Sequence, residues 1–239
     1  MRTRLSVFLI TLSGLVLEVG LTRIYSASVW YHFAFVAVSV ALLGWGLGGF
    51  TVHLLKQRMQ LTMNAAALIT AIYSMTVPFC LWLLNRYPFE IDRLPLYFLA
   101  PLIPFFLAGM ALSIVFALHR TEVSSLYFAD LIGAALGAVL VTFLLHWLGG
   151  EVALLTGAIA PAFAALLLAT DKKEVTTSSP QAIRLLAFVA VLVTVGSTIA
   201  AIKFDILRVE AGTTKAMRRQ MDAAPQAHIT QTGWNAYSR

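Results

Sequence analysis

The chain has 239 residues, of which 59% are hydrophobic and only 12% are charged, with a formal net charge of +6. Because a soluble domain carries about 25% charged residues, this composition excludes a soluble enzyme, a disordered chain and a disulfide-stabilised scaffold. It is typical of a multi-pass integral membrane protein.

Seven stretches are long and apolar enough to cross a bilayer, which takes about 20 helical residues. We predict spans over residues 5–28, 32–55, 64–84, 96–118, 125–147, 151–170 and 183–203. Helices are expected because backbone groups in lipid must be hydrogen-bonded within their own segment, and the continuous apolar runs do not alternate as barrel strands do. The predicted fold is therefore all-α, with a seven-helix transmembrane domain over residues 1–203.

The first span follows a basic start, a pattern that is shared with cleaved secretory signals. Its apolar run is long for a signal, and the small-residue site at residues 26–28 comes late, so we expect the segment to remain as a span. Further along, Gly149-Gly150 predicts a tight hairpin between the fifth and sixth spans. Ser124-Ser125 predicts the amino-terminal cap of the fifth span.

The distribution of Lys and Arg predicts that the amino terminus lies inside, because cytoplasmic loops are enriched in these residues. In that orientation the outer loops hold Arg86 and Arg93, beside Glu90 and Asp92. The inner segments hold eight basic residues, which are Arg2, Arg4, Lys56, Arg58, Arg120, Lys172, Lys173 and Arg184. The short loops fit a bacterial inner (cytoplasmic) membrane. Seven spans would then place the carboxyl tail outside.

Three ionisable residues within the spans form a candidate intramembrane polar site. Glu18 lies near the middle of the first span, and Arg23 lies about 140° further around the same helix, so these two cannot pair along one face. Asp130 lies near the start of the fifth span. An ionisable residue inside a membrane costs about 2.5–3.5 kcal/mol on insertion scales and usually has a partner or a function. Each of the three therefore indicates either a proton or cation site, or a structural hydrogen bond between helices.

Glycine pairs indicate where helices pack closely. Gly44 and Gly48 are four residues apart in the second span, and Gly133 and Gly137 are four apart in the fifth. This spacing lets two membrane helices approach and pack by van der Waals contact. The glycine-rich run over residues 44–49 is no dinucleotide loop, because no strand precedes it.

The sequence contains no other pattern that is typical of a chemical site. No two histidines have a metal-ligand spacing, and the single Cys80 has no companion. The basic residues are scattered, which excludes a nucleic-acid surface. We expect no cofactor, no metal and no catalytic constellation within residues 1–239, and the expected partners are the lipid bilayer and other membrane protein subunits.

Residues 204–239 form a polar tail of 36 residues that is too short for a core of its own. The last residues alternate and carry aromatic side chains, as in the approach to a strand. We therefore expect that this tail is the start of a soluble domain in a longer chain, and the alternative is a short polar tail.

Several stretches resemble one family. Residues 14–30 (GLVLEVGLTRIYSASVW), 41–49 (ALLGWGLGG), 126–140 (LYFADLIGAALGAVL) and the tail segment 233–239 (GWNAYSR) are similar to polytopic spermidine-synthase-like proteins. In that fused major-facilitator-like and spermidine synthase type, a membrane domain precedes an aminopropyltransferase-like domain. The resemblance implies that Glu18, Arg23 and Asp130 occupy recurrent polar membrane positions. The glycine-rich loop and acidic residues of the transferase half are missing here.

Three hypotheses of function follow. The first is a non-catalytic membrane anchor and interaction domain of the spermidine-synthase-like type, acting as an accessory or scaffold subunit of a membrane assembly. The second is a transporter of a small solute, such as a cation or a polyamine-like molecule, with the three ionisable residues along its path. The third is the front part of a membrane-tethered aminopropyltransferase-like enzyme.

Overall fold

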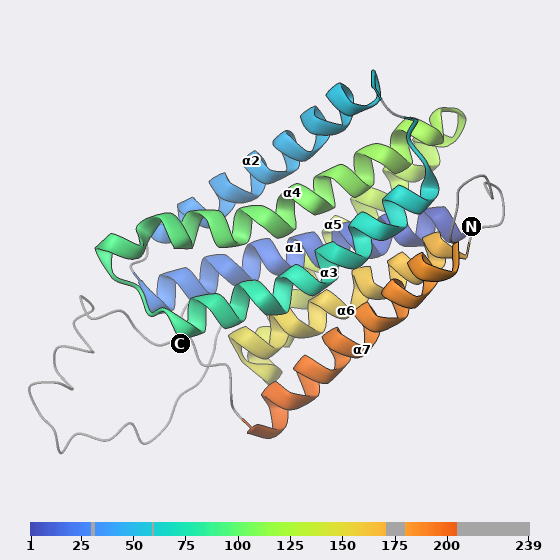
Figure 1. Ribbon diagram of the computed structural model, residues 1–239. Helices are drawn as coiled ribbons and strands as arrows, with labels where there is room; N and C mark the ends of the chain where they lie inside the picture. Colours follow the sequence, from blue (N-terminus) through green and yellow to red (C-terminus); the bar gives the residue numbers. More distant parts are fainter. Residues whose placement is uncertain (30–31, 59, 171–179, 205–239) are drawn as a thin grey trace, which may run out of the picture.

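The computed structural model of the chain describes residues 1–29, 32–58, 60–170 and 180–204. Within these ranges the structure contains helices and no strands, and seven of the helices are long and apolar enough to cross a membrane (Figure 1). These helices are α1 (Arg2–Ser28), α2 (Phe33–Leu55), α3 (Met63–Arg86), α4 (Leu94–Leu118), α5 (Val123–Leu148), α6 (Gly150–Ala169) and α7 (Pro180–Phe204). Two short 3-10 helices, η1 (Ile91–Arg93) and η2 (Arg120–Glu122), precede α4 and α5.

The predicted all-α, seven-span fold is confirmed. Each observed helix coincides with one predicted span, and most helices extend a few residues beyond the apolar run at one end or both. The extensions are expected because a helix continues into the polar headgroup region, where polar residues are no longer costly. The polar connection at residues 171–179 and the tail from residue 205 onward, including the proposed start of a soluble domain, lie outside the described residues.

The connection between α5 and α6 is the tight hairpin that the two glycines predict. Gly149 both ends α5 and precedes α6, and its φ of 82° with a ψ of 173° lies in a region that only glycine adopts without strain. The predicted cap at Ser124-Ser125 is wrong, because α5 begins already at Val123. The Ser125 hydroxyl instead donates a hydrogen bond of 2.9 Å to the carbonyl of Glu122.

Helix α1 is the centre of the bundle. It packs mainly on α5 and α6, and also on α2 and α4 (Figure 1). Helix α3 packs on α4, α6 and α7, whereas α5 has α1 as its principal neighbour.

The two ends of the bundle differ in charge. At one end, which we call the basic end, Arg2 and Arg184 donate hydrogen bonds of 2.9 and 3.2 Å to the carbonyls of Thr170 and Ala169. These carbonyls end α6, where a cationic side chain is favoured by the helix dipole. The described basic residues of the predicted inner segments are Arg2, Arg4, Lys56, Arg58, Arg120 and Arg184, while Lys172 and Lys173 lie outside the described residues.

At the opposite end, two basic side chains have acidic or aromatic neighbours. Arg93 forms an ion pair of 3.4 Å with Glu90, and it lies 5.9 Å from the centroid of the Tyr87 ring. Arg86 lies 5.7 Å from the same ring. The described basic residues of the predicted inner segments thus outnumber those of the opposite end, and the orientation in the membrane stays a prediction.

Candidate functional site

The predicted packing glycines lie where two helices touch through their backbones. A Cβ added to Gly44 would lie 2.5 Å from the Cβ of Phe105 in α4, and one added to Gly48 would lie 2.7 Å from the amide nitrogen of Met110. In α5, Gly133 and Gly137 lie against backbone atoms of Phe8 and Leu12 in α1. These four positions hold α2 on α4 and α5 on α1 at distances that leave no room for a side chain.

Three neighbouring helices divide the surface of α1 into sectors. At each contact either a glycine of α1 admits a side chain of its neighbour, or a glycine of the neighbour admits α1. The contacts that define the sectors are those of Gly14 with α2, of Phe8 and Leu12 with α5, and of Val16 and Gly20 with α6.

Glu18 projects into the sector between α2 and α5. Because an α-helix turns by about 100° per residue, Glu18 lies about 40° from Gly14, and Leu12 lies about 160° from Gly14 in the same sense. Helices α2 and α5 make no extended contact with each other in the described part of the chain. We call this side of α1 the open sector, since lipid or another protein can reach it between the two helices.

Glu18 is partly exposed and has no partner in the described structure. No hydrogen bond or ion pair joins its carboxyl group to any residue of the described ranges. Its place in the middle of an apolar span makes an unpaired carboxylate cost about 2.5–3.5 kcal/mol. Glu18 is therefore an intramembrane acid that the described residues leave without a partner.

Asp130 has a partner that the sequence did not predict. The Thr11 hydroxyl of α1 donates a hydrogen bond of 2.6 Å to Oδ1 of Asp130. Thr11 is buried and Asp130 is partly exposed. Asp130 therefore serves as a hydrogen-bonded link between α1 and α5, next to the glycine contact at Gly133.

The described structure does not join the three ionisable residues into one cluster. Arg23 is partly exposed and makes no hydrogen bond or ion pair with a described residue, Glu18 included. Thr11 and Glu18 are seven residues apart, which places them about 20° apart on α1. Thr11, Glu18 and Thr22 thus form a polar stripe along the open sector. Arg23 lies about 140° from Glu18 around α1, on the other side of the contact with α5.

Two hydrogen bonds from tyrosine side chains join α1 to neighbouring helices in the bundle interior. Tyr73 of α3 donates a hydrogen bond of 3.0 Å to the Ser13 hydroxyl, and Tyr25 donates one of 2.6 Å to the carbonyl of Tyr97. Tyr25, Tyr73 and Tyr97 have no exposed surface. Hydrogen bonds therefore join α1 to α3 and α4 in the buried interior, whereas Glu18 and Thr22 are partly exposed on another side of α1.

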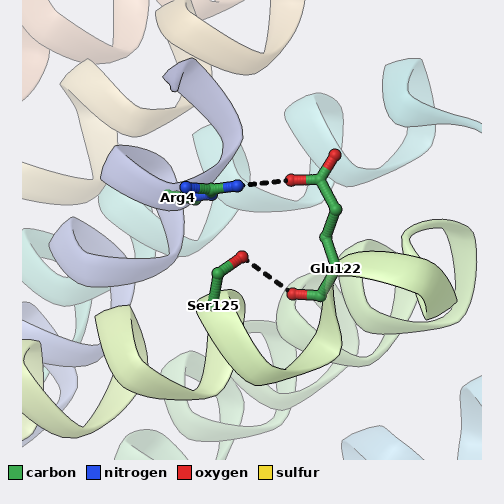
Figure 2. Close-up of polar contacts among 3 residues, drawn as sticks. All are labelled: Arg4, Glu122 and Ser125. Atoms are coloured by element: carbon green, nitrogen blue, oxygen red, sulfur yellow. Dashed lines mark hydrogen bonds and ion pairs between the residues drawn. The ribbon is translucent and has the colours of Figure 1, made fainter.

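A second polar contact fastens α1 to α5 at the basic end. Figure 2 shows Arg4 reaching across to Glu122, with 3.0 Å between Nη2 and Oε2, while Ser125 contacts the carbonyl of Glu122. The side chains of Arg4 and Glu122 are 51% and 44% exposed, so this ion pair contributes at most about 1 kcal/mol to stability. Its main consequence is that the charge of Arg4 is neutralised.

The carboxyl group of Glu18 gives the open sector a hydrogen-bond acceptor. Glu18 can receive a hydrogen bond or pair with a cation that approaches through the open sector. Among the described residues, no group of three or more His, Cys, Asp and Glu side chains could hold a metal ion.

The contact of Thr11 with Asp130 was not predicted from the sequence. The type of Thr11 and its seven-residue separation from Glu18 were visible, but a threonine in a span commonly bonds to its own helix backbone. Only the register of α5 against α1 reveals its contact with Asp130.

No family model matches the chain, and no curated protein or solved structure matches it either.

Proposed function

We propose that this protein is a non-catalytic membrane anchor and interaction domain, which binds a transmembrane helix of another membrane protein in the open sector of α1. The observation that supports the proposal is Glu18, a partly exposed carboxyl group in the middle of α1 that has no partner among the described residues. Intramembrane acids normally face the interior or pair with another group, and this one does neither.

The chemistry of Glu18 specifies the partner. A carboxylate in an apolar environment is best satisfied by a basic side chain, because the ion pair removes most of the insertion cost of both groups. The partner is therefore a transmembrane helix that carries a Lys or Arg at the depth of Glu18. The partner helix would lie on α1 between α2 and α5, which both pack on α1 and make no extended contact with each other in the described part of the chain.

The neighbouring helices supply apolar surface for the same contact. On the sides of these helices that border the sector, the exposed residues include Leu42 in α2 and Tyr127 in α5, which lie about 60° around the helix from Trp45 and from Asp130 respectively. In a membrane, apolar surface alone does not drive helix association. The polar contact would therefore supply specificity, and close van der Waals packing would supply the remaining binding free energy.

A transporter is supported less well by the same geometry. A solute path would need polar groups that line a passage through the bundle, whereas the polar groups around Ser13, Tyr25 and Tyr73 are paired in a closed interior. We keep the spermidine-synthase-like type and a bacterial inner-membrane location, with the amino terminus inside, as parts of the proposal. They rest on the sequence patterns and the charge of the basic end.

Site-specific photocrosslinking in the native membrane tests the proposal. A photoreactive amino acid at Thr22, one turn from Glu18 in the open sector, is expected to attach to a transmembrane segment that contains Lys or Arg, as read by mass spectrometry of the crosslinked peptide. Adding Glu18→Gln is expected to reduce this product. The matched control places the photoreactive amino acid at Phe188, which is exposed on α7 and remote from the sector.

Two results would contradict the proposal. One is that Thr22 crosslinks to lipid alone. The other is that the protein product is the same with Glu18→Gln or contains no basic residue in its span. Charge exchange provides the sharpest confirmation, since Glu18→Lys should lose the product and an acidic residue in the partner should restore it.

A further inference from the structure

A shallow hollow at the basic end combines unpaired positive charge with an apolar floor. It lies between the ends of α2 and α4, has a volume of about 450 Å³, and is lined by Lys56, Gln60, Leu61, Ala117, Leu118 and Arg120. None of the described residues that line it is acidic. The hollow is remote from Glu18, so it is independent of the proposed function.

The donors of this hollow are largely free. The side chains of Lys56 and Gln60 are exposed and make no hydrogen bond or ion pair with a described residue. Arg120 uses only Nε, which donates a hydrogen bond of 3.3 Å to the carbonyl of Ala117. Its two terminal nitrogens therefore remain available for an acceptor from outside the chain.

The carboxyl-terminal end of α2 does not need the positive charge of Lys56. The last carbonyls of that helix already accept backbone hydrogen bonds, which the amide nitrogens of Lys56, Gln57 and Arg58 donate at 2.9 to 3.3 Å. The ammonium group is consequently not needed as a cap. Helix α3 begins at Met63, two residues after Leu61, so its positive amino-terminal end lies close by and also favours an anion.

A second hollow at the same end provides an internal comparison. It has a volume of about 460 Å³ and is lined by residues that include Arg4, Glu122 and Ser125. There the arginine is paired with Glu122 at 3.0 Å (Figure 2). Two arginines thus lie at one end of the bundle in hollows of similar size, and of these two Arg120 is the one without a carboxylate partner among the described residues.

We infer that the hollow between α2 and α4 binds the phosphate of an anionic phospholipid headgroup. Lys56 and Arg120 pair with the phosphate, Gln60 donates to a headgroup oxygen, and Leu61, Ala117 and Leu118 contact the start of the acyl chains. The position at the ends of two apolar spans places the hollow at headgroup depth, and basic pockets between helix ends recognise such lipids.

Native mass spectrometry of the purified full-length chain tests this inference. The protein is titrated with phosphatidylglycerol and, separately, with phosphatidylcholine, which has a phosphate but no net charge. We expect preferential retention of phosphatidylglycerol, and Arg120→Gln should weaken its binding about five-fold, equivalent to about 1 kcal/mol for one surface charge. Lys56→Gln provides a second variant with the same expected effect.

Arg4→Gln is the matched control, since it removes one arginine from the other hollow at the same end. It should leave phosphatidylglycerol binding unchanged. The inference is overturned if Arg4→Gln and Arg120→Gln weaken binding equally, which would indicate only the net charge of this end. It is also overturned if inorganic phosphate displaces the lipid, which would identify a site for free phosphate.

Discussion

Replacing Gly48 by alanine should separate α2 from α4. The added Cβ would lie 2.7 Å from the amide nitrogen of Met110 and 3.0 Å from the carbonyl carbon of Gly109, which are backbone atoms and cannot rotate away. Ordinary contact begins at 3.4 Å, so one helix must retreat by at least 0.7 Å, the difference between 3.4 and 2.7 Å. Overpacking of this kind costs about 1–3 kcal/mol.

The same helix contains its own control. Gly46 is two residues away, faces open space, and has no atom within 4 Å of an added Cβ. Gly46→Ala should leave stability unchanged or raise it by up to about 1 kcal/mol, because alanine is the better helix former.

Both variants can be compared by equilibrium unfolding in mixed detergent micelles with increasing dodecyl sulfate, followed by circular dichroism. The expected result is a lower free energy of unfolding for Gly48→Ala and none of that loss for Gly46→Ala. Equal effects of the two substitutions would refute the proposed α2–α4 contact.

Two further predictions use the same unfolding assay. Thr11→Val should lower the free energy of unfolding by about 1–3 kcal/mol, because it leaves Asp130 without its donor. Thr22→Val should have little effect, since the described hydrogen bond of Thr22 is to Val19 of its own helix. Equal losses of stability in the two variants would contradict the reasoning. Gly149→Ala should cost about 1–3 kcal/mol of backbone strain at the φ of 82°, and an unchanged stability would contradict the hairpin conformation.

The spans were predictable from sequence because span length and hydropathy are local properties. The bilayer fixes how many apolar residues a helix needs, so each predicted range falls on one observed helix. The hairpin at Gly149 was predictable for a similar reason, since adjacent glycines between two apolar runs allow a sharp turn. The two 3-10 helices were not predicted, because short polar connections contain no comparable periodic signal.

The neighbours of each helix were not predictable from this single sequence. The spacing of Gly44 and Gly48 predicts a close helix contact, but not that the partner is α4. Likewise, Asp130 signals an unusual polar group without naming Thr11. These facts depend on the register between helices, which arises from the shape of both packed surfaces together. The open sector beside Glu18 emerges only when all the neighbours of α1 are in place.

The central claim is that Glu18 is an intramembrane carboxyl group that the chain leaves open for a partner. Dicyclohexylcarbodiimide, an apolar reagent that modifies carboxyl groups within the membrane, tests it directly with peptide mass spectrometry as the readout. We predict that Glu18 is modified in the purified protein, that the reaction is lost in Glu18→Gln, and that Glu18 is protected in native membranes where the partner is bound. An unreactive Glu18 in the purified protein, or equal labelling in both preparations, would contradict the account.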